Sequence, residues 1–439
     1  MARRKQLIIA TSSWPIGRHA SAWRLPEALI PHPVDPTYLA DTAAAAERGL
    51  FDYFFVGNAI SSEPSRERTW TNDVFKAEGF ALGAFVAART SHVGIVVTTN
   101  TTYADPYDTA RSAVTLEHLS GGRLGLNLVL GLAGIDLPAA NYGRMAHPER
   151  DTRYERAEEF TTILRDLQHS WDKDWFVGDR QSGRLYNSDA FHPIHFAGTH
   201  LSVDGALNVP PPIQPEIPLI HAGTSPQSLA FGASHAAVRF SPYFGTEYNS
   251  DYYRAVQQSS IDAGRDPDDV AVLPGITFYV GGTTTEARAK FREVQQLVMA
   301  EYAPAAVSQA VGQDVTGVSP GERAADVLSD DTLHTSPWLQ TAFDAFGGHD
   351  VTLEDLFRYT ANAGHLNQNS VVGDGRYVAD WIAERFEGRV LDGVKVFPPY
   401  SRTPLDAFVD LVVPELQALG LHRTEYAGTT LTEHLRQSR

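Results

Sequence analysis

Short apolar runs alternate with longer amphipathic stretches along most of the chain. The runs that are rich in β-branched and other apolar residues, and that predict buried strands, are 6–11, 53–56, 92–99, 123–129, 219–222, 237–240, 270–280 and 393–397. The stretches with helical spacing are 37–48, 75–88, 106–119, 154–171, a segment starting at Pro226, 249–263, 285–303, 376–386 and 405–419. Alternating strands and helices predict an α/β fold with a parallel sheet. About eight such units predict a closed (β/α)8 (TIM) barrel rather than an open sheet.

Two segments interrupt this alternation and are predicted insertions. The first, about 172–215, is rich in Gly, Pro and aromatic residues, and the second spans about 304–370. Barrels of this kind often exceed the average domain size. We therefore expect residues 1–439 to form one barrel domain that carries both insertions.

Composition narrows the functional classes. The 439 residues include no cysteine, which excludes disulfides, thiolate metal sites, iron–sulfur clusters and a cysteine nucleophile. The net charge of −17 opposes binding to nucleic acid or to anionic membrane surfaces. The basic residues 3–5 precede an apolar run, 7–10, that is too short for a signal peptide or a membrane span. These features predict a cytoplasmic protein without nucleic-acid or membrane partners.

The clearest chemical motif lies where the predicted strand 219–222 meets the helix that starts at Pro226. The sequence there is Ala222, Gly223, Thr224 and Ser225. Active sites of this fold lie at the carboxyl ends of the strands, and free N–H groups at a helix N-terminus attract anions. The motif fits a phosphate-binding loop. It also fits an ordinary Ser/Thr helix cap followed by proline.

Other strand ends carry polar residues that suit a ligand. Arg150 and Tyr154 are four residues apart, so they share a helix face on which a guanidinium and a phenol can hold a phosphate. Thr102 belongs to a threonine-rich segment after the third strand, and Asn127 interrupts an apolar strand where a buried amide needs partners. Solvated or purely structural roles are the alternatives for each of them.

Several other chemistries have little support. His192 and His195 have metal-ligand spacing but lie in an insertion without a helical carboxylate, so we expect no metal site. No dinucleotide-binding glycine motif, Walker loop or nucleophile elbow is present. Trp23 and Trp70 lie in early loops near the barrel mouth, where they either line an apolar substrate pocket or serve as plain packing.

Together these segments resemble the bacterial-luciferase-like flavin monooxygenases. The chain is most similar to the branch with the nitrilotriacetate, dibenzothiophene-sulfone and pristinamycin IIA monooxygenases. The matching segments span nearly the whole chain and are 19–24 (HASAWR), 46–52 (AERGLFD), 101–107 (TTYADPY), 116–123 (LEHLSGGR), 153–160 (RYERAEEF), 222–225 (AGTS), 273–276 (LPGI), 408–416 (FVDLVVPEL) and 423–431 (RTEYAGTTL).

The resemblance implies a two-component enzyme, usually a homodimer. It would take reduced FMN from a separate NAD(P)H:flavin reductase and oxygenate a small organic molecule through a C4a-(hydro)peroxyflavin. Residues 222–225 match the family's phosphate loop and Tyr154 matches its phosphate-binding tyrosine. Thr102 matches a threonine near the flavin ring, and Asn127 matches the buried asparagine of the fourth strand.

Some positions depart from the family pattern. Asn58 stands where the family usually has Asp, Leu130 and Gly131 where it has Thr-Ser, and Arg150 where it has His. Asn58 keeps a hydrogen-bonding group, and Arg150 can still hold phosphate. Gly131 removes a hydroxyl. The departures at Asn58 and Gly131 keep open a flavin-binding accessory subunit without turnover. A deazaflavin-dependent oxidoreductase is a second rival, against which the branch-specific insertion and the C-terminal tail argue.

A flavin oxygenase must shield its oxygenating species from water, so we expect the two insertions to form a lid. On the substrate side the sequence suggests Trp23 and Trp70. The catalytic candidates are His19 and His365, because a histidine near its ordinary pKa can move a proton at neutral pH. A structural role is the alternative for both histidines.

Overall fold

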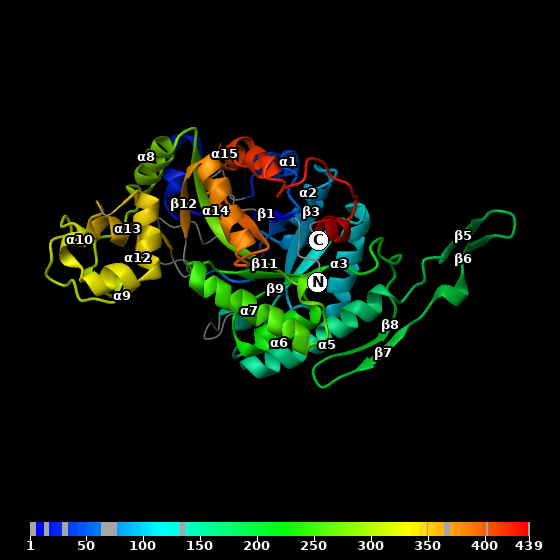
Figure 1. Ribbon diagram of the computed structural model, residues 1–439. Helices are drawn as coiled ribbons and strands as arrows, with labels where there is room; N and C mark the ends of the chain where they lie inside the picture. The colour runs from blue at the N-terminus through cyan, green and yellow to red at the C-terminus, as the bar shows by residue number, and fades with distance from the viewer. Residues whose placement is uncertain are drawn as a thin grey trace.

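Eight parallel strands close into a barrel at the centre of the protein (Figure 1). The computed structural model describes residues 6–12, 17–28, 34–62, 77–131, 137–348, 350–363, 369–400 and 403–437. The ring consists of β1 (Ile8–Ser12), β2 (Tyr53–Val56), β3 (Gly94–Asn100), β4 (Leu124–Val129), β9 (Leu219–Ala222), β10 (Val238–Ser241), β11 (Ala271–Gly281) and β13 (Gly393–Phe397). It closes because β13 pairs with β1 on one side and with β11 on the other. The predicted TIM barrel and its eight strands are confirmed.

A further strand, β12 (Ser370–Asp374), was not predicted. It pairs with the outer half of β11, from Thr277 to Gly281, beginning at the residue where the pairing of β11 with β13 ends. The apolar run of β12 is only two valines long, so its periodicity gives no usable signal.

Helices and short 3₁₀ helices surround the barrel on its outside and at its ends. They are α1 (Pro36–Arg48), α2 (Gly79–Ala87), α3 (Pro106–Leu119), α4 (Leu137–Asn141), α5 (Arg150–Gln168), α6 (Pro226–His235), α7 (Thr246–Asp262), α8 (Thr284–Gln295), α14 (Gly375–Glu387), α15 (Thr403–Leu411), α16 (Val413–Ala418) and α17 (Leu431–Gln437), with the short 3₁₀ helices η1 (Ala22–Arg24), η2 (Pro26–Ala28), η3 (Ser188–Ala190) and η4 (Pro267–Asp269). The predicted helix 405–419 is divided at Val412, because Pro414 cannot donate the hydrogen bond that a continuous helix needs.

The C-terminal helix closes the amino-end floor of the barrel. Leu431 is fully buried and Leu435 nearly so, and both join the cluster of side chains inside the strands. A β-carbon at Gly94 or at Gly125 would lie 2.7 Å from a methyl group of Leu431. Glycine at these two positions therefore makes room for the leucine that fills the floor.

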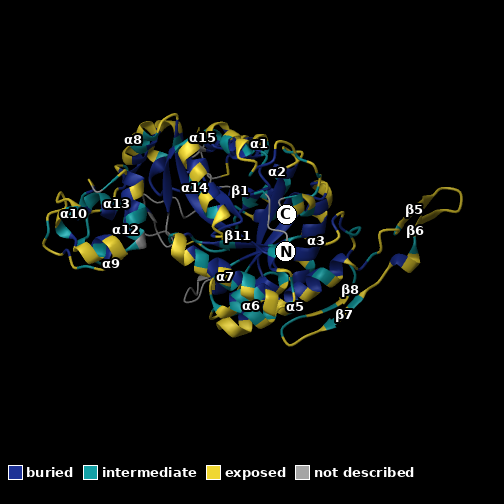
Figure 2. Ribbon diagram, in the orientation of Figure 1, coloured by how far each residue is buried: buried dark blue, intermediate teal, exposed yellow. Residues whose placement is uncertain are grey.

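The two insertions lie on different sides of the barrel in Figure 1. The first forms two hairpins, β5 (Phe176–Asp179) with β6 (Arg184–Tyr186), and β7 (Ile194–Ala197) with β8 (Ser202–Gly205). All residues of β5 and β6 are exposed, and Figure 2 shows this hairpin projecting away from the barrel. The β5–β6 hairpin therefore does not cover the mouth as the lid prediction required. The β7–β8 hairpin packs Ile194, Phe196 and Val203 against the core cluster beside α5.

The second insertion packs at the carboxyl-end rim. It contains α9 (Pro304–Val311), α10 (Ala324–Val327), α11 (Asp330–Thr335), α12 (Pro337–Phe346) and α13 (Leu353–Ala363). Its apolar side chains form one cluster with Ala22 and Leu25, which follow β1, and with Tyr400, which follows β13. This placement agrees with a cover for the mouth. In the described ranges, no helix has the length and apolar character needed to cross a membrane.

Candidate active site

The loop between β9 and α6 has the geometry of an anion cradle. Gly223 has φ +132°, and a β-carbon there would lie 2.5 Å from the Ser228 hydroxyl, so the backbone at this point has to be glycine. The Ser225 hydroxyl accepts the N–H of Ser228 at 3.2 Å and keeps its own proton available for a ligand. Within the described part of the chain, the N–H groups of Thr224 and Ser225 find no acceptor. A phosphate fits here, because free donors converge at a helix N-terminus.

A buried arginine that was not predicted as a site residue holds this loop in place. Arg239 is 1 % exposed and donates to the Gly223 carbonyl at 2.6 Å and to the Ser228 carbonyl at 2.9 Å. Tyr252 also donates to the Gly223 carbonyl, at 3.1 Å. Because these bonds hold the carbonyl on the protein side, the loop is organised before any ligand binds. A lone arginine inside a four-residue strand has no spacing signal that would reveal this role.

Beneath the loop, His221 is held in one neutral form. Its Nδ1 lies 2.8 Å from the Leu128 carbonyl, which can only accept, so Nδ1 carries the proton. Its Nε2 lies 3.1 Å from the Ser228 hydroxyl. Burial, with Arg239 as the next contribution, lowers the pKa of His221 to about 3. The imidazole therefore supports the loop as a neutral hydrogen-bonding group.

The predicted phosphate residues on α5 lie beside the loop. Tyr154 is partly buried, and its ring centre is 6.4 Å from that of His221 and 6.1 Å from that of Phe231. The first turns of α5 and α6 are joined by a hydrogen bond of 3.1 Å from the amide of Gln227 to the carboxylate of Asp151. Arg150 is exposed in the same turn of α5. The structure thus brings two helix N-termini, a phenol and an arginine to one side of the barrel mouth.

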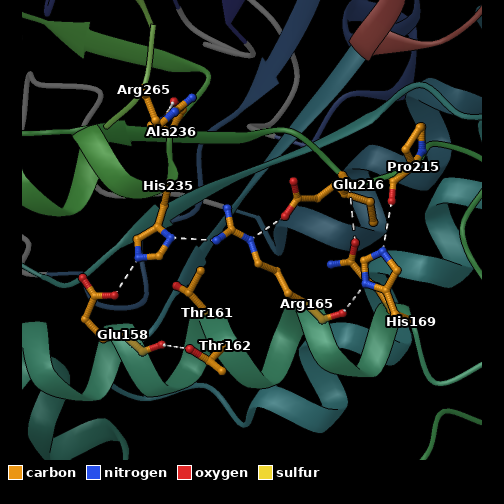
Figure 3. Close-up of polar contacts among 12 residues, drawn as sticks. Glu158, Thr161, Thr162, Arg165, His169, Pro215, Glu216, His235, Ala236 and Arg265 are labelled. Atoms are coloured by element: carbon orange, nitrogen blue, oxygen red, sulfur yellow. Dashed lines mark hydrogen bonds and ion pairs between the residues drawn. The ribbon is translucent and has the colours of Figure 1, made fainter. Parts of the chain in front are cut away.

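A polar network keeps α5 in register with α6 (Figure 3). Arg165 donates to Nδ1 of His235 at 2.9 Å and lies 2.5 Å from the carboxylate of Glu216. Because a guanidinium only donates, Nε2 of His235 carries the proton that bonds Glu158 at 2.6 Å. His169, at the end of α5, bonds the Pro215 carbonyl at 3.2 Å. These contacts fix α5 against the segment that leads into β9.

Asn58, which follows β2, and Asn127 of β4 both form a hydrogen bond with Thr98 of β3. Asn127 is 5 % exposed and donates to the Thr98 hydroxyl at 3.1 Å. The amide of Asn58 donates to the Thr98 carbonyl at 3.3 Å. Two of the predicted cofactor residues are therefore brought together through β3, and the amide oxygen of each is still able to accept a ligand hydrogen bond.

Thr102 lies next to the other departures from the family pattern. Its hydroxyl donates to the Leu130 carbonyl at 2.7 Å, so towards a ligand it serves as an acceptor. Arg153, which is 5 % exposed, donates to the carbonyls of Leu130 and Gly131 at 3.1 and 2.7 Å. A β-carbon at Gly131 would lie 2.8 Å from the ring of His147. The space that a larger residue would fill is thus occupied by that imidazole, and Arg153 shapes the loop.

The predicted substrate-side residues are only partly within the described ranges. His19 is fully buried, and burial lowers its pKa to about 3, so its imidazole is neutral at physiological pH. Its Nδ1 accepts the N–H of Ser21 at 3.2 Å. Trp23 lies in η1, partly buried. Trp70 and His365 lie outside the described residues.

A cavity of about 400 Å³ opens on another side of the mouth, between the loop after β2 and α3. Asn58, Thr99 and Asn100 line it together with Glu78, Asp105 and Asp108, among others. Three carboxylates repel a phosphate, so this cavity does not compete with the β9–α6 loop as the anion site. Nor do the described residues bring three metal-ligating side chains together. His192 and His195 each bond a neighbouring aspartate instead, at 2.7 and 2.6 Å.

Comparison with known proteins identifies the family of the chain. A model described as "Luciferase-like monooxygenase" matches residues 16–392. The chain belongs to the luciferase-like monooxygenase family. It is 30 % identical to N-acetyl-S-(2-succino)cysteine monooxygenase of Bacillus subtilis over 99 % of this chain and 97 % of that one. Nitrilotriacetate monooxygenase component A of Aminobacter aminovorans is 31 % identical, with the same coverage of both chains.

A solved structure agrees with the barrel. A riboflavin lyase determined with modified FMN and riboflavin superimposes with a TM-score of 0.79 and 25 % identity, covering 98 % of this chain and 95 % of that one. The resemblance predicted from the sequence motifs is therefore confirmed at the level of the family and the fold. The roles of the individual site residues stay predictions.

Proposed function

We propose that this protein is the oxygenase component of a two-component flavin monooxygenase. It would accept reduced FMN from a separate NAD(P)H:flavin reductase and oxygenate a small organic molecule, working as a homodimer. The observation that carries the proposal is the preorganised anion cradle at residues 222–225, which offers free donors for a terminal phosphate. The relatives that share almost the full length of the chain are monooxygenases, which supports oxygen transfer over deazaflavin-dependent hydride transfer.

Each part of the site then has a physical task. The loop 222–225, with Tyr154 and Arg150, would hold the FMN phosphate. Asn58, Asn127 and Thr102 would offer acceptors to the polar edge of the ring. Bound reduced FMN would supply the electrons that activate dioxygen. The chain itself orients that ring and excludes water, through its apolar barrel wall and the second insertion at the rim.

Protonation in this site would not come from a histidinium at neutral pH. Both His19 and His221 have a pKa lowered to about 3, and burial is the main cause. A role of His19 in catalysis would therefore use the neutral imidazole, which can donate or accept a hydrogen bond at a ring nitrogen but carries no extra proton.

The phosphate assignment can be tested directly. Anaerobic calorimetry with reduced FMN should show at least a tenfold weaker Kd for Tyr154→Phe combined with Ser225→Ala. The matched control, Tyr186→Phe with Ser182→Ala, removes the same groups from the exposed β5–β6 hairpin and should bind as the wild type does. Equal affinity in both double variants would refute the phosphate site.

Turnover is a separate measurement. With a flavin reductase, NADH and ¹⁸O₂, a panel of small metabolites should yield a product that carries one labelled oxygen atom. Tight FMN binding without labelled product from any compound would favour the accessory-subunit alternative, whereas absence of FMN binding would reject the flavin proposal as a whole.

A further inference from the structure

Lys395 is a buried cationic residue that the proposed mechanism does not use. It lies in the middle of β13, is 4 % exposed, and points among aromatic rings inside the barrel. Its Nζ is 3.1 Å from the ring centre of Phe55, 4.8 Å from that of Phe240 and 5.6 Å from that of Phe397. Burial, and then the charge of Arg18, lower the pKa of Lys395 well below its usual value.

Among the residues that the structure describes, none supplies a counterion to the amine. Throughout the described ranges, no carboxylate or other hydrogen-bond acceptor bonds Nζ. The one charged group that acts on it electrostatically is Arg18, which has the same sign. A buried amine without an acceptor is unfavourable, and proteins keep such groups mainly where a ligand completes them. A purely apolar residue such as methionine would fill this space without that cost.

The rings around Lys395 form a built site. A β-carbon at Gly275, which pairs with Lys395 across β11 and β13, would lie 2.3 Å from the Phe397 ring and 2.8 Å from the Phe240 ring. Glycine at this position therefore lets both rings turn inward, where they meet edge to face with centres 6.2 Å apart. On the other side, Lys395 pairs with Ala10, whose small side chain leaves room for the lysine stem.

The site faces the functional end of the barrel. Phe55 pairs with Ser12, the last residue of β1, and both Phe55 and Phe240 are only partly buried although they lie on the inner wall. Arg18, in the loop after β1, places its guanidinium 5.4 Å from the centre of the Phe397 ring. Two cationic side chains thus share one aromatic wall at the mouth of a protein whose net charge is −17.

We propose that Lys395 binds an anionic group of the substrate, a carboxylate or a sulfonate, at the base of the barrel mouth, with the adjoining apolar part between the phenylalanine rings. The incoming anion supplies the missing acceptor and favours the charged ammonium. This inference rests on the proposed function only in taking the molecule that enters the mouth to be the oxygenation substrate. It narrows that substrate to an organic acid with an apolar body.

Binding of a simple aromatic acid tests the inference without flavin or turnover. Benzoate and benzamide have the same shape and differ in charge, so the ratio of their Kd values isolates the anion. In the wild type, calorimetry should show benzoate binding at least tenfold more tightly than benzamide. Lys395→Met should abolish this preference, whereas Lys173→Met, an exposed lysine of the first insertion, should retain it.

Each contrary result is informative. Equal affinities for benzoate and benzamide in the wild type would overturn the inference even if the variant failed to fold. An undiminished preference in folded Lys395→Met would overturn it as well.

The reduced flavin ring is a second anion that enters the barrel mouth, so a second measurement separates the two sources. The ratio of Kd values for oxidised and reduced FMN should be the same in Lys395→Met and in the wild type. If Lys395→Met changes this ratio and the wild type shows no preference for benzoate over benzamide, the amine serves the cofactor. That result would overturn the substrate assignment. Retained benzoate preference without any FMN binding would refute the proposed function while leaving the anion site standing.

Discussion

The substitution Gly223→Ala gives the sharpest test of the phosphate loop. At φ +132° an L-residue is strained by about 1–3 kcal/mol. The new β-carbon would also lie 2.5 Å from the Ser228 hydroxyl and 3.0 Å from its β-carbon. Ser228 cannot move freely, because Arg239 and His221 both bond its hydroxyl. The loop must therefore distort, and the donors that face the ligand move with it.

We expect two measurable consequences. Urea unfolding should show a loss of about 1–3 kcal/mol in unfolding free energy, equal to the backbone strain. Calorimetry should show FMN binding weakened about ten- to a hundredfold, because each tenfold corresponds to about 1.4 kcal/mol of lost interaction.

The control variant is Gly264→Ala. Gly264 also has a left-handed backbone, with φ +75°, but a β-carbon there meets nothing within 4 Å and the residue lies beyond the end of α7, away from the loop. This variant should lose about 1 kcal/mol of stability and keep the wild-type FMN affinity. Unchanged FMN affinity in folded Gly223→Ala, or equal weakening in both variants, would refute the argument.

Two further predictions concern stability. Leu431→Ala should lower the unfolding free energy by about 2–5 kcal/mol, because it empties the floor of the barrel between Gly94 and Gly125; a loss below about 1 kcal/mol in urea would show that the floor is not packed as described. The unfolding free energy should also fall as the pH drops from 6.5 towards 3, because the unfolded chain protonates His19 and His221 at their ordinary pKa near 6.5 whereas the fold keeps both neutral down to a pKa of about 3. Urea titrations at pH 7 and pH 5 measure this loss of unfolding free energy. An equally large loss in His221→Gln would contradict the prediction.

Much of the barrel could be predicted because the sequence patterns of its strands and helices involve neighbouring residues. Buried parallel strands such as β3 contain short apolar runs rich in β-branched residues, and helices such as α3 begin at a capping aspartate followed by proline. Both patterns can be recognised from neighbouring residues alone. The phosphate loop was predictable for the same reason, since its glycine, hydroxyls and proline are adjacent in the sequence.

The residues that were missed act across the fold. Arg239 and Arg153 stabilise loops by donating to carbonyls of other segments, and His147 fills the space beside Gly131 from a distance along the chain. None of these contacts leaves a spacing pattern. The direction of the first insertion was likewise unpredictable, because its composition shows turns and aromatic residues but not the surface against which they pack.

Buried charged side chains are compensated in different ways at the two ends of the barrel. At the amino-end floor, Asp52 forms a buried ion pair with Arg423 and also accepts the N–H of Ile9, so the carboxylate is compensated by the chain itself. At the carboxyl end, Arg239 is compensated by carbonyls, whereas among the described residues Lys395 meets aromatic rings and a like charge. Because a buried charge without a partner is unfavourable, the pKa of Lys395 is lowered, and its charged form needs a compensating group. At the mouth of this barrel, the compensation that we infer is an anion brought by the substrate.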